Sequence, residues 1–223
     1  MNTSITNARM HALFLDGPAG HLEALLNAGS ENATHCALVT HPHPLYGGTM
    51  HNKVVYHAAK ALNAAGFPVL RFNFRGAGGS QGTHDEGRGE VDDVRAALAF
   101  LKQKFNLPII FAGFSFGAAV GLRACCPDPD VVALISLGTP LSAEGRHYTY
   151  SFLETCTKPK LFISGKQDEY ASPERLAEVV SRAAEPRQLV LIDDADHFFG
   201  GQLPDMRREI EIWVGRQFTS SPR

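Results

Sequence analysis

The segment Gly113-Phe114-Ser115-Phe116-Gly117 constrains the fold of this chain more than any other feature. It follows the apolar run 108–112 and precedes an alanine- and glycine-rich stretch that is typical of a helix. Gly-x-Ser-x-Gly between a strand and a helix is the pattern of a nucleophile elbow, a turn so sharp that only Gly or Ala is expected two positions either side of the serine. The turn raises the hydroxyl above the sheet edge, at a helix N-terminus. Ser115 is therefore a candidate nucleophile.

Apolar runs with strand character alternate with helical patterns along most of the chain. Strands are expected at 10–15, 22–26, 36–40, 67–74, 109–112, 131–137, 160–164 and 188–192. Helices are expected at 52–65, 90–105 and 206–218, and a further helix begins at Ser172-Pro173-Glu174. This order predicts an α/β fold with a mostly parallel sheet, helices on both faces, and ligands at the carboxyl ends of the strands. We find no repeat or linker, so 1–223 is interpreted as a single domain.

Composition excludes several classes of function. The 223 residues are 44% hydrophobic and carry a net charge of −2, which argues against a nucleic-acid or membrane-surface partner. No run approaches the length of a membrane-spanning helix, and the first residues lack a secretory signal pattern. The four cysteines, which lack zinc-type spacing, are Cys36, Cys125, Cys126 and Cys156. We interpret them as reduced thiols in a cytoplasmic protein.

A serine hydroxyl needs a base within hydrogen-bond reach, and that base needs an acid to orient it. Asp168 follows the expected strand 160–164, and His197 follows the strand 188–192. Both would therefore lie at the same sheet edge as Ser115, in the chain order Ser, acid, His. His197 would take the serine proton, and Asp168 would hold the imidazole. The rival acids are too close in sequence to His197 to come from a separate strand end: Asp193, Asp194 and Asp196.

The segment 41–48 follows the strand 36–40 and is the candidate oxyanion loop. One donor to a developing negative charge should be the N–H of Phe116, directly after the serine, and the other should come from this loop. Pro42 and Pro44 have no N–H, which leaves His43, the favoured donor, and Leu45 as the alternative. Histidines 41, 43 and 51 have no carboxylate or cysteine at ligand spacing, so hydrogen bonds to nearby backbone are expected in place of a metal site.

A second glycine-rich segment, 71–82, contains Gly-x-Gly but lacks the full spacing of a dinucleotide-binding loop, and it lacks the Lys-Ser/Thr pair of a P-loop. We interpret it as a structural loop under the site. Arg75 within it is expected to pair with Asp85, Glu86 or Glu90. Those acids are expected to serve the start of the following helix.

Taken together, four segments resemble the α/β-hydrolase superfamily over nearly the whole chain: His41-Pro42-His43-Pro44-Leu45-Tyr46-Gly47-Gly48-Thr49-Met50, Phe72-Asn73-Phe74-Arg75-Gly76, the elbow, and Ala195-Asp196-His197-Phe198-Phe199. The combination is similar to a small, lidless group of bacterial serine hydrolases related to the dienelactone hydrolases, which have cysteine where this chain has Ser115. The resemblance implies an eight-stranded sheet with strand two antiparallel, and ester hydrolysis as the default activity. The superfamily's oxyanion loop is often His-Gly-x-Pro, which supports His43 as donor.

The interval 138–159 is too short for the helical cap that many members of the superfamily insert there, and it is expected to hold one short helix near 148–155. Without a cap, we expect an open site that accepts small or extended acyl groups. The expected apolar wall comprises Tyr46, Phe114, Tyr148, Phe152 and Phe198, with Phe116, Tyr150 and Phe199 as further candidates. About half of these aromatics are expected to serve core packing instead.

The leading hypothesis is a cytoplasmic carboxylesterase that forms an acyl-serine from a small-molecule ester, without cofactor or metal. Thioester cleavage, acyl transfer and perhydrolysis use the same nucleophile and stay open. The alternative from a different functional class is a protein that binds a ligand without catalysing a reaction. The sequence does not decide the oligomeric state, with a homodimer as one option.

Overall fold

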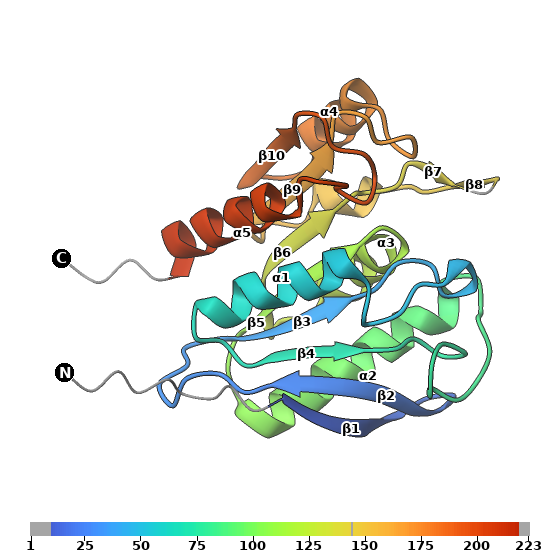
Figure 1. Ribbon diagram of the computed structural model, residues 1–223, viewed down its shortest axis with the longest axis vertical. Helices are drawn as coiled ribbons and strands as arrows, with labels where there is room; N and C mark the ends of the chain where they lie inside the picture. Colours follow the sequence, from blue (N-terminus) through green and yellow to red (C-terminus); the bar gives the residue numbers. More distant parts are fainter. Residues whose placement is uncertain (1–9, 144, 219–223) are drawn as a thin grey trace.

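The computed structural model describes residues 10–143 and 145–218, which form one eight-stranded sheet beside a separate two-stranded hairpin (Figure 1). The strand order is β1-β2-β4-β3-β5-β6-β9-β10. In chain order the strands are β1 (Met10–Gly17), β2 (Gly20–Asn27), β3 (Cys36–Thr40), β4 (Val69–Phe72), β5 (Ile109–Phe114), β6 (Val131–Leu137), β9 (Lys160–Gly165) and β10 (Arg187–Ile192). Strand β2 pairs antiparallel with both β1 and β4, and the pairs from β4 to β10 are parallel. The sheet therefore has the expected size and one antiparallel strand.

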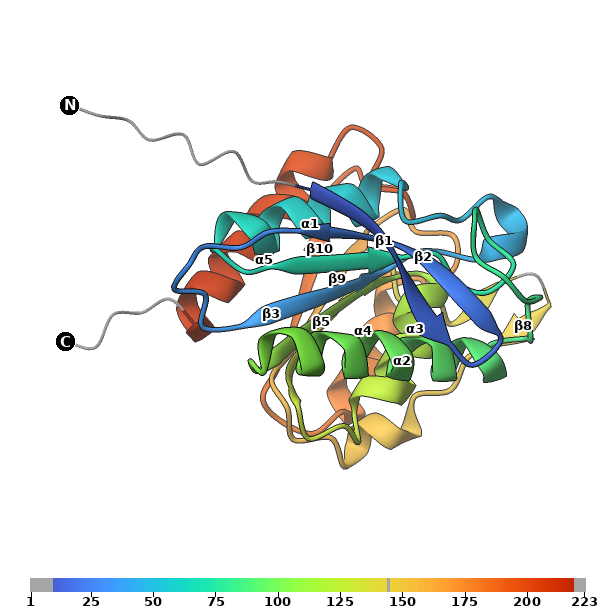
Figure 2. The ribbon, with the colours of Figure 1, turned by 90° about the horizontal axis from the view of Figure 1, so that it is seen from below.

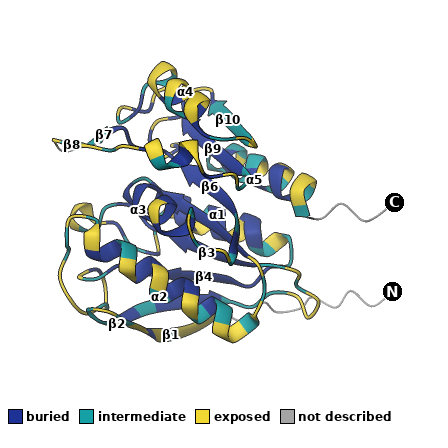
Figure 3. Ribbon diagram, turned by 180° about the vertical axis from the view of Figure 1, so that it is seen from behind, coloured by how far each residue is buried: buried dark blue, intermediate teal, exposed yellow. Residues whose placement is uncertain are grey.

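Helices cover both faces of this sheet (Figures 1 and 2). Helices α1 (Lys53–Ala64) and α5 (Leu203–Phe218) lie together on one face, and α2 (Arg88–Phe105) and α3 (Phe116–Cys125) pack side by side on the other, together with α4 (Pro173–Arg182). Each face has its own apolar core, and the two cores are separated by the sheet. Because the central strands are covered on both sides, β3, β4 and β5 are buried along their whole length (Figure 3).

Glu90, one of the acids expected to serve the start of α2, caps this helix. Glu90 accepts hydrogen bonds from the backbone N–H groups of Asp85 and Gly87 at 2.8 Å, which satisfies donors ahead of the helix. The expected partners of Arg75 are wrong. Its guanidinium instead binds the carboxylate of Asp93, one helical turn further on, at 2.7 Å. This pair attaches the glycine-rich loop after β4 to the side of α2.

The segment that connects β6 to β9, residues 138–159, is called the crossover segment below. It forms a hairpin of two-residue strands, β7 (Ser142–Ala143) and β8 (Arg146–His147), followed by a short 3₁₀ helix at Ser151–Glu154. The hairpin projects beyond the carboxyl ends of the parallel strands (Figure 1). The sequence predicts one short helix here but not the hairpin, because strands of two residues leave no periodic pattern.

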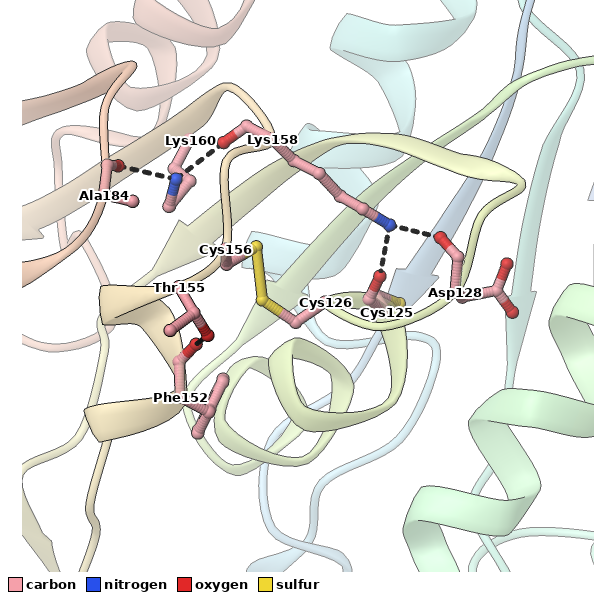
Figure 4. The surroundings of a disulfide bond; sticks show 9 residues. All are labelled: Cys125, Cys126, Asp128, Phe152, Thr155, Cys156, Lys158, Lys160 and Ala184. Carbon is pink, nitrogen blue, oxygen red and sulfur yellow. Dashed lines mark hydrogen bonds between the residues drawn. A yellow bond between two sulfur atoms is a disulfide. The ribbon is translucent and has the colours of Figure 1, made fainter.

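Cys126 and Cys156 form a disulfide that joins the end of α3 to the end of the crossover segment (Figure 4). Nearby, Lys158 reaches the carbonyl oxygens of Cys125 and Asp128, a second connection between the same two parts of the chain. The expectation of reduced thiols throughout is therefore wrong for Cys126 and Cys156, whereas Cys36 and Cys125 are free and buried. Thirty positions separate the paired cysteines, so only the tertiary fold brings them together.

In the part of the chain that the structure describes, no helix combines the length and the apolar character needed to cross a bilayer.

Candidate active site

Ser115 lies at the junction of β5 and α3, with φ of +55° and ψ of −122°. A side-chain-bearing residue in this region of backbone space carries strain of about 1–3 kcal/mol. The conformation is fixed from both sides: the Ser115 N–H donates to the carbonyl oxygen of Leu137 on β6 at 2.9 Å, and the Ser115 carbonyl accepts from Ala119 N at 3.0 Å. The neighbouring strand and the new helix thus hold the hydroxyl at the carboxyl edge of the sheet.

The two elbow glycines are required for a reason that the sequence did not show. A Cβ at Gly113 would lie 2.7 Å from Ala118 Cα, and a Cβ at Gly117 would lie 2.4 Å from the carbonyl oxygen of His41. Both distances are shorter than carbon atoms tolerate, so the expectation that alanine would also fit is wrong here. At Gly117 the obstacle is the neighbouring strand end, because α3 starts directly against the residues after β3.

His197 connects Ser115 to Asp168 through short contacts. Its Nε2 lies 2.9 Å from Ser115 Oγ, and its Nδ1 lies 3.0 Å from both carboxylate oxygens of Asp168. An ionised carboxylate only accepts hydrogen bonds, so Nδ1 carries the proton and Nε2 is left to accept from the serine hydroxyl. Asp168 and His197 are buried, 5% and 2% exposed, which strengthens the electrostatic contact between them. The three predicted residues therefore meet at one sheet edge.

The orientation of Asp168 is set by two further donors. Ser164 Oγ donates to Oδ2 at 3.0 Å, and Tyr170 N donates to Oδ1 at 2.9 Å. Ser164 is fully buried at the end of β9, a role that the sequence analysis did not anticipate.

The rival acids lie elsewhere. Asp193 pairs with Lys166, and Asp196 accepts hydrogen bonds from the backbone N–H groups of Phe198 and Gly200. These contacts shape the loop that carries His197.

Aromatic rings and one glycine hold the imidazole of His197. The ring of Tyr170 meets it edge to face with centroids 4.4 Å apart, and the ring of Phe114 lies 5.1 Å away on centroids. Gly138, with φ of +50°, leaves space, because a Cβ there would come within 3.1 Å of His197 Cε1. Close aromatic contacts of this kind restrict the ring to one orientation.

The loop after β3 is arranged around two histidines with different roles. His41 is fully buried and bridges two strand ends, donating from Nδ1 to the Pro42 carbonyl at 2.7 Å and accepting at Nε2 from Phe74 N at 2.9 Å. Burial lowers the pKa of His41 to about 4, so the ring is neutral at pH 7. This matches the expected backbone hydrogen bonding of loop histidines. In the described residues, no group of three or more His, Cys, Asp or Glu side chains is arranged to hold a metal ion.

His43 packs its ring against the rings of Tyr46, His84 and Phe116, with centroids 4.7–4.8 Å apart. These contacts place the ring of His43 beside the ring of Phe116, the first residue of α3. Phe116 begins that helix, whose first N–H groups have no carbonyl partner within it. Leu45, the alternative donor, is largely exposed and lies outside the residues that line the cavity above Ser115.

A cavity of about 230 Å³ opens above Ser115 and His197. It is lined by Tyr46, Tyr148 and Phe198, three of the five residues expected to bind substrate, and by Phe116. The structure places the other two outside it: Phe114 is fully buried beneath His197, and Phe152 packs with the core next to the disulfide. Sequence reasoning missed three polar lining residues: Asn52, Arg146 and Tyr170. No local pattern marks them, because loops and the small hairpin bring them together.

The fold agrees with the comparison to known proteins. The model of the alpha/beta hydrolase domain family matches residues 37–208. The chain is an α/β-hydrolase. Among curated proteins, this α/β-hydrolase is 38% identical over 214 residues to an uncharacterised protein of Rickettsia prowazekii, covering 92% of this chain and 89% of the relative.

Two solved structures extend the likeness. An alpha-beta serine hydrolase homologue from Coxiella burnetii is 36% identical to this α/β-hydrolase, with a TM-score of 0.84 and coverage of 92% of this chain and 97% of the other. A serine hydrolase without a lid from Xanthomonas campestris is 34% identical, with a TM-score of 0.83 and coverage of 96% and 97%. These likenesses support hydrolase activity and a lidless architecture for this α/β-hydrolase.

Proposed function

We propose that this α/β-hydrolase is a carboxylesterase that cleaves esters of small to medium acyl groups through an acyl-serine intermediate. The observation that carries the proposal is the unbroken series of contacts from Ser115 Oγ through His197 to Asp168, at 2.9 and 3.0 Å, at the base of an open cavity. A non-catalytic binding protein would have no need of a strained serine held in this geometry.

The geometry supports a two-step reaction. Ser115 Oγ attacks the ester carbonyl carbon while His197 Nε2 takes its proton, and the Asp168 carboxylate stabilises the imidazolium. The carbonyl oxygen becomes an oxyanion, for which the backbone N–H groups of Phe116 and His43 are the proposed donors. The bond to the leaving alcohol then breaks, and the alcohol receives the proton from Nε2. Water repeats the sequence on the acyl-serine, which releases the acid and restores the hydroxyl.

The open cavity sets the expected size of the substrate. The crossover segment supplies one wall through Ala143 and Tyr148, and it adds a hairpin in place of a cap domain. Activity toward small-molecule esters should therefore begin below the concentration at which the substrate forms micelles, without interfacial activation. A cytoplasmic location was expected from reduced cysteines, and the Cys126–Cys156 disulfide removes that support.

The deciding experiment compares the wild type with Ser115→Ala on p-nitrophenyl esters of increasing chain length and on matched thioesters. We expect kcat to fall by about 10⁴–10⁶-fold in the variant, the range found when a nucleophile of this kind is removed. A fluorophosphonate probe should label the wild type and spare the variant, while circular dichroism should show the same fold in both. Wild-type protein that neither labels nor hydrolyses any ester would disprove the proposal, and a strong preference for thioesters would shift it to a thioesterase.

A further inference from the structure

Arg146 gives the cavity above Ser115 a charge that ester hydrolysis itself does not require. It lies on β8 of the crossover segment, and its side chain is 29% exposed. Among the described residues that line the cavity, Arg146 is the one with a permanent charge, and none is an aspartate or glutamate. A guanidinium beside a reactive carbonyl is a recognition element for carboxylate or phosphate groups, because its planar N–H donors match their oxygens.

The contacts of Arg146 hold its guanidinium in place. One guanidinium nitrogen, Nη1, contacts His43 Nε2, and the positive charge lies near enough to Tyr148 to oppose the rise in the pKa of its hydroxyl that burial causes. An arginine can only donate, so His43 must present an unprotonated nitrogen to it. Burial, the neighbouring His84 and Arg146 together lower the pKa of His43 to about 4. At neutral pH the histidine is therefore an uncharged support that leaves the positive charge of Arg146 in place.

Arg146 forms an ion pair with Glu86 that is open to solvent. Arg146 Nη2 lies 3.0 Å from Glu86 Oε2, but the Glu86 side chain is 57% exposed and is not part of the cavity lining. Ion pairs this exposed contribute little stability, because water and salt screen them. Since guanidinium has five N–H donors, an anion in the cavity can bind beside Glu86 or replace it.

The position of Arg146 indicates which part of a substrate it would meet. His197 returns its proton to the leaving alcohol, so that alcohol lies next to His197, whose ring is in contact with Tyr170 and Phe198. Arg146 contacts His43 instead, on the loop proposed to bind the oxyanion. The acyl chain, which stays attached to Ser115 during the reaction, is the part that can extend toward the guanidinium.

We propose that Arg146 binds a carboxylate at the far end of the acyl group, so that the preferred substrates are half-esters of short dicarboxylic acids. This inference rests on the proposed ester hydrolysis and adds a substrate class to it. Arg146 takes part in no bond-making step: it positions the acyl group through charge-assisted hydrogen bonds.

The kinetic test uses two esters that differ in one group, mono-p-nitrophenyl glutarate and p-nitrophenyl valerate, with the uncatalysed rate subtracted. The quantity measured is the ratio of kcat/KM for glutarate to that for valerate. We expect Arg146→Met to lower this ratio by about tenfold to a hundredfold, mainly through KM. Glu86→Gln should raise it, because the competing carboxylate is gone. Arg123→Met is the matched control, since it removes an exposed arginine of α3 that lies outside this cavity, and its ratio should stay within about twofold of wild type.

A binding measurement separates this inference from the proposed function. In the Ser115→Ala background, calorimetry should show that monomethyl glutarate binds more tightly than methyl valerate, and that Arg146→Met abolishes the difference. If the wild type fails to hydrolyse any ester while this difference persists, the esterase proposal fails and the subsite stands. Equal loss on both esters in Arg146→Met, or no binding difference, overturns the subsite. A preference for 4-carboxyphenyl butyrate over 4-methylphenyl butyrate that depends on Arg146 overturns its assignment to the acyl side.

Discussion

Two regions of the chain meet at the candidate site, and different interactions hold each of them in place. The carboxyl ends of β5, β9 and β10 carry or precede Ser115, Asp168 and His197, and the first two strands are buried along their whole length. The crossover segment supplies Ala143, Arg146 and Tyr148 from two-residue strands and the turn after them, and a disulfide secures its far end. The proposed chemistry therefore depends on the register of a buried sheet, whereas the positive charge of the cavity and one of its walls depend on a short surface segment.

Among the variants that test this comparison, Asp168→Asn is expected to have the largest effect. In Asp168→Asn the side-chain amide can donate to His197 Nδ1, so the proton moves to Nε2 and the ring cannot accept from Ser115. We expect kcat on p-nitrophenyl butyrate to fall by about 10⁴-fold with KM little changed. The melting temperature serves as the check on folding. A loss of less than tenfold would show that the buried carboxylate does not set the tautomer.

Glycine substitutions test the difference in packing between the two regions. Gly117→Ala would bring a methyl group against the His41 carbonyl oxygen, so we expect a loss of about 3 kcal/mol in the free energy of unfolding. Gly145→Ala in the hairpin meets nothing within 4 Å and adds only the cost of φ near +75°, about 1 kcal/mol. Urea denaturation measures both. Equal losses at the two positions would remove the distinction between a packed elbow and an open hairpin.

The disulfide can be removed without touching the strand ends. Cys126→Ser should lower the free energy of unfolding by about 2–4 kcal/mol, because the reduced chain gains conformational freedom in a loop of thirty positions. Dithiothreitol should destabilise the wild type to the same extent and leave the variant unaffected. If the reductant does not change the wild-type melting temperature, this bond contributes nothing to stability.

The last expected effect is a pH dependence of stability at His41, which appears only in acid. Burial lowers its pKa from the ordinary value near 6.5 to about 4 in the folded chain. Between those values the unfolded chain binds a proton that the folded chain does not, so stability falls as the pH is lowered from 6.5 to 4, by up to about 3 kcal/mol. His41→Gln loses this titration, so its stability deficit relative to wild type should shrink over the same interval. A constant deficit from pH 7 to pH 4 would contradict the assignment.

Local sequence patterns were enough to predict most of the strands and helices that position the site. The elbow motif required a strand before Ser115 and a helix after it, and both are present as β5 and α3. Because carboxyl ends of parallel strands share one edge, the positions of Asp168 and His197 after their own strands were enough to predict that they meet Ser115. Periodicity carries this information, since it is a property of residues close together in the chain.

Only the tertiary structure decided which distant residues became neighbours. Arg75 lies close to several acids in the sequence, yet its partner is Asp93, because the loop after β4 packs against the side of α2. Cys126 and Cys156 come together because the end of the crossover segment packs against the end of α3, and Arg146 enters the cavity because the β7–β8 hairpin lies beside Ser115 and His197. These contacts follow from how separate elements pack, and no spacing along the chain encodes that packing.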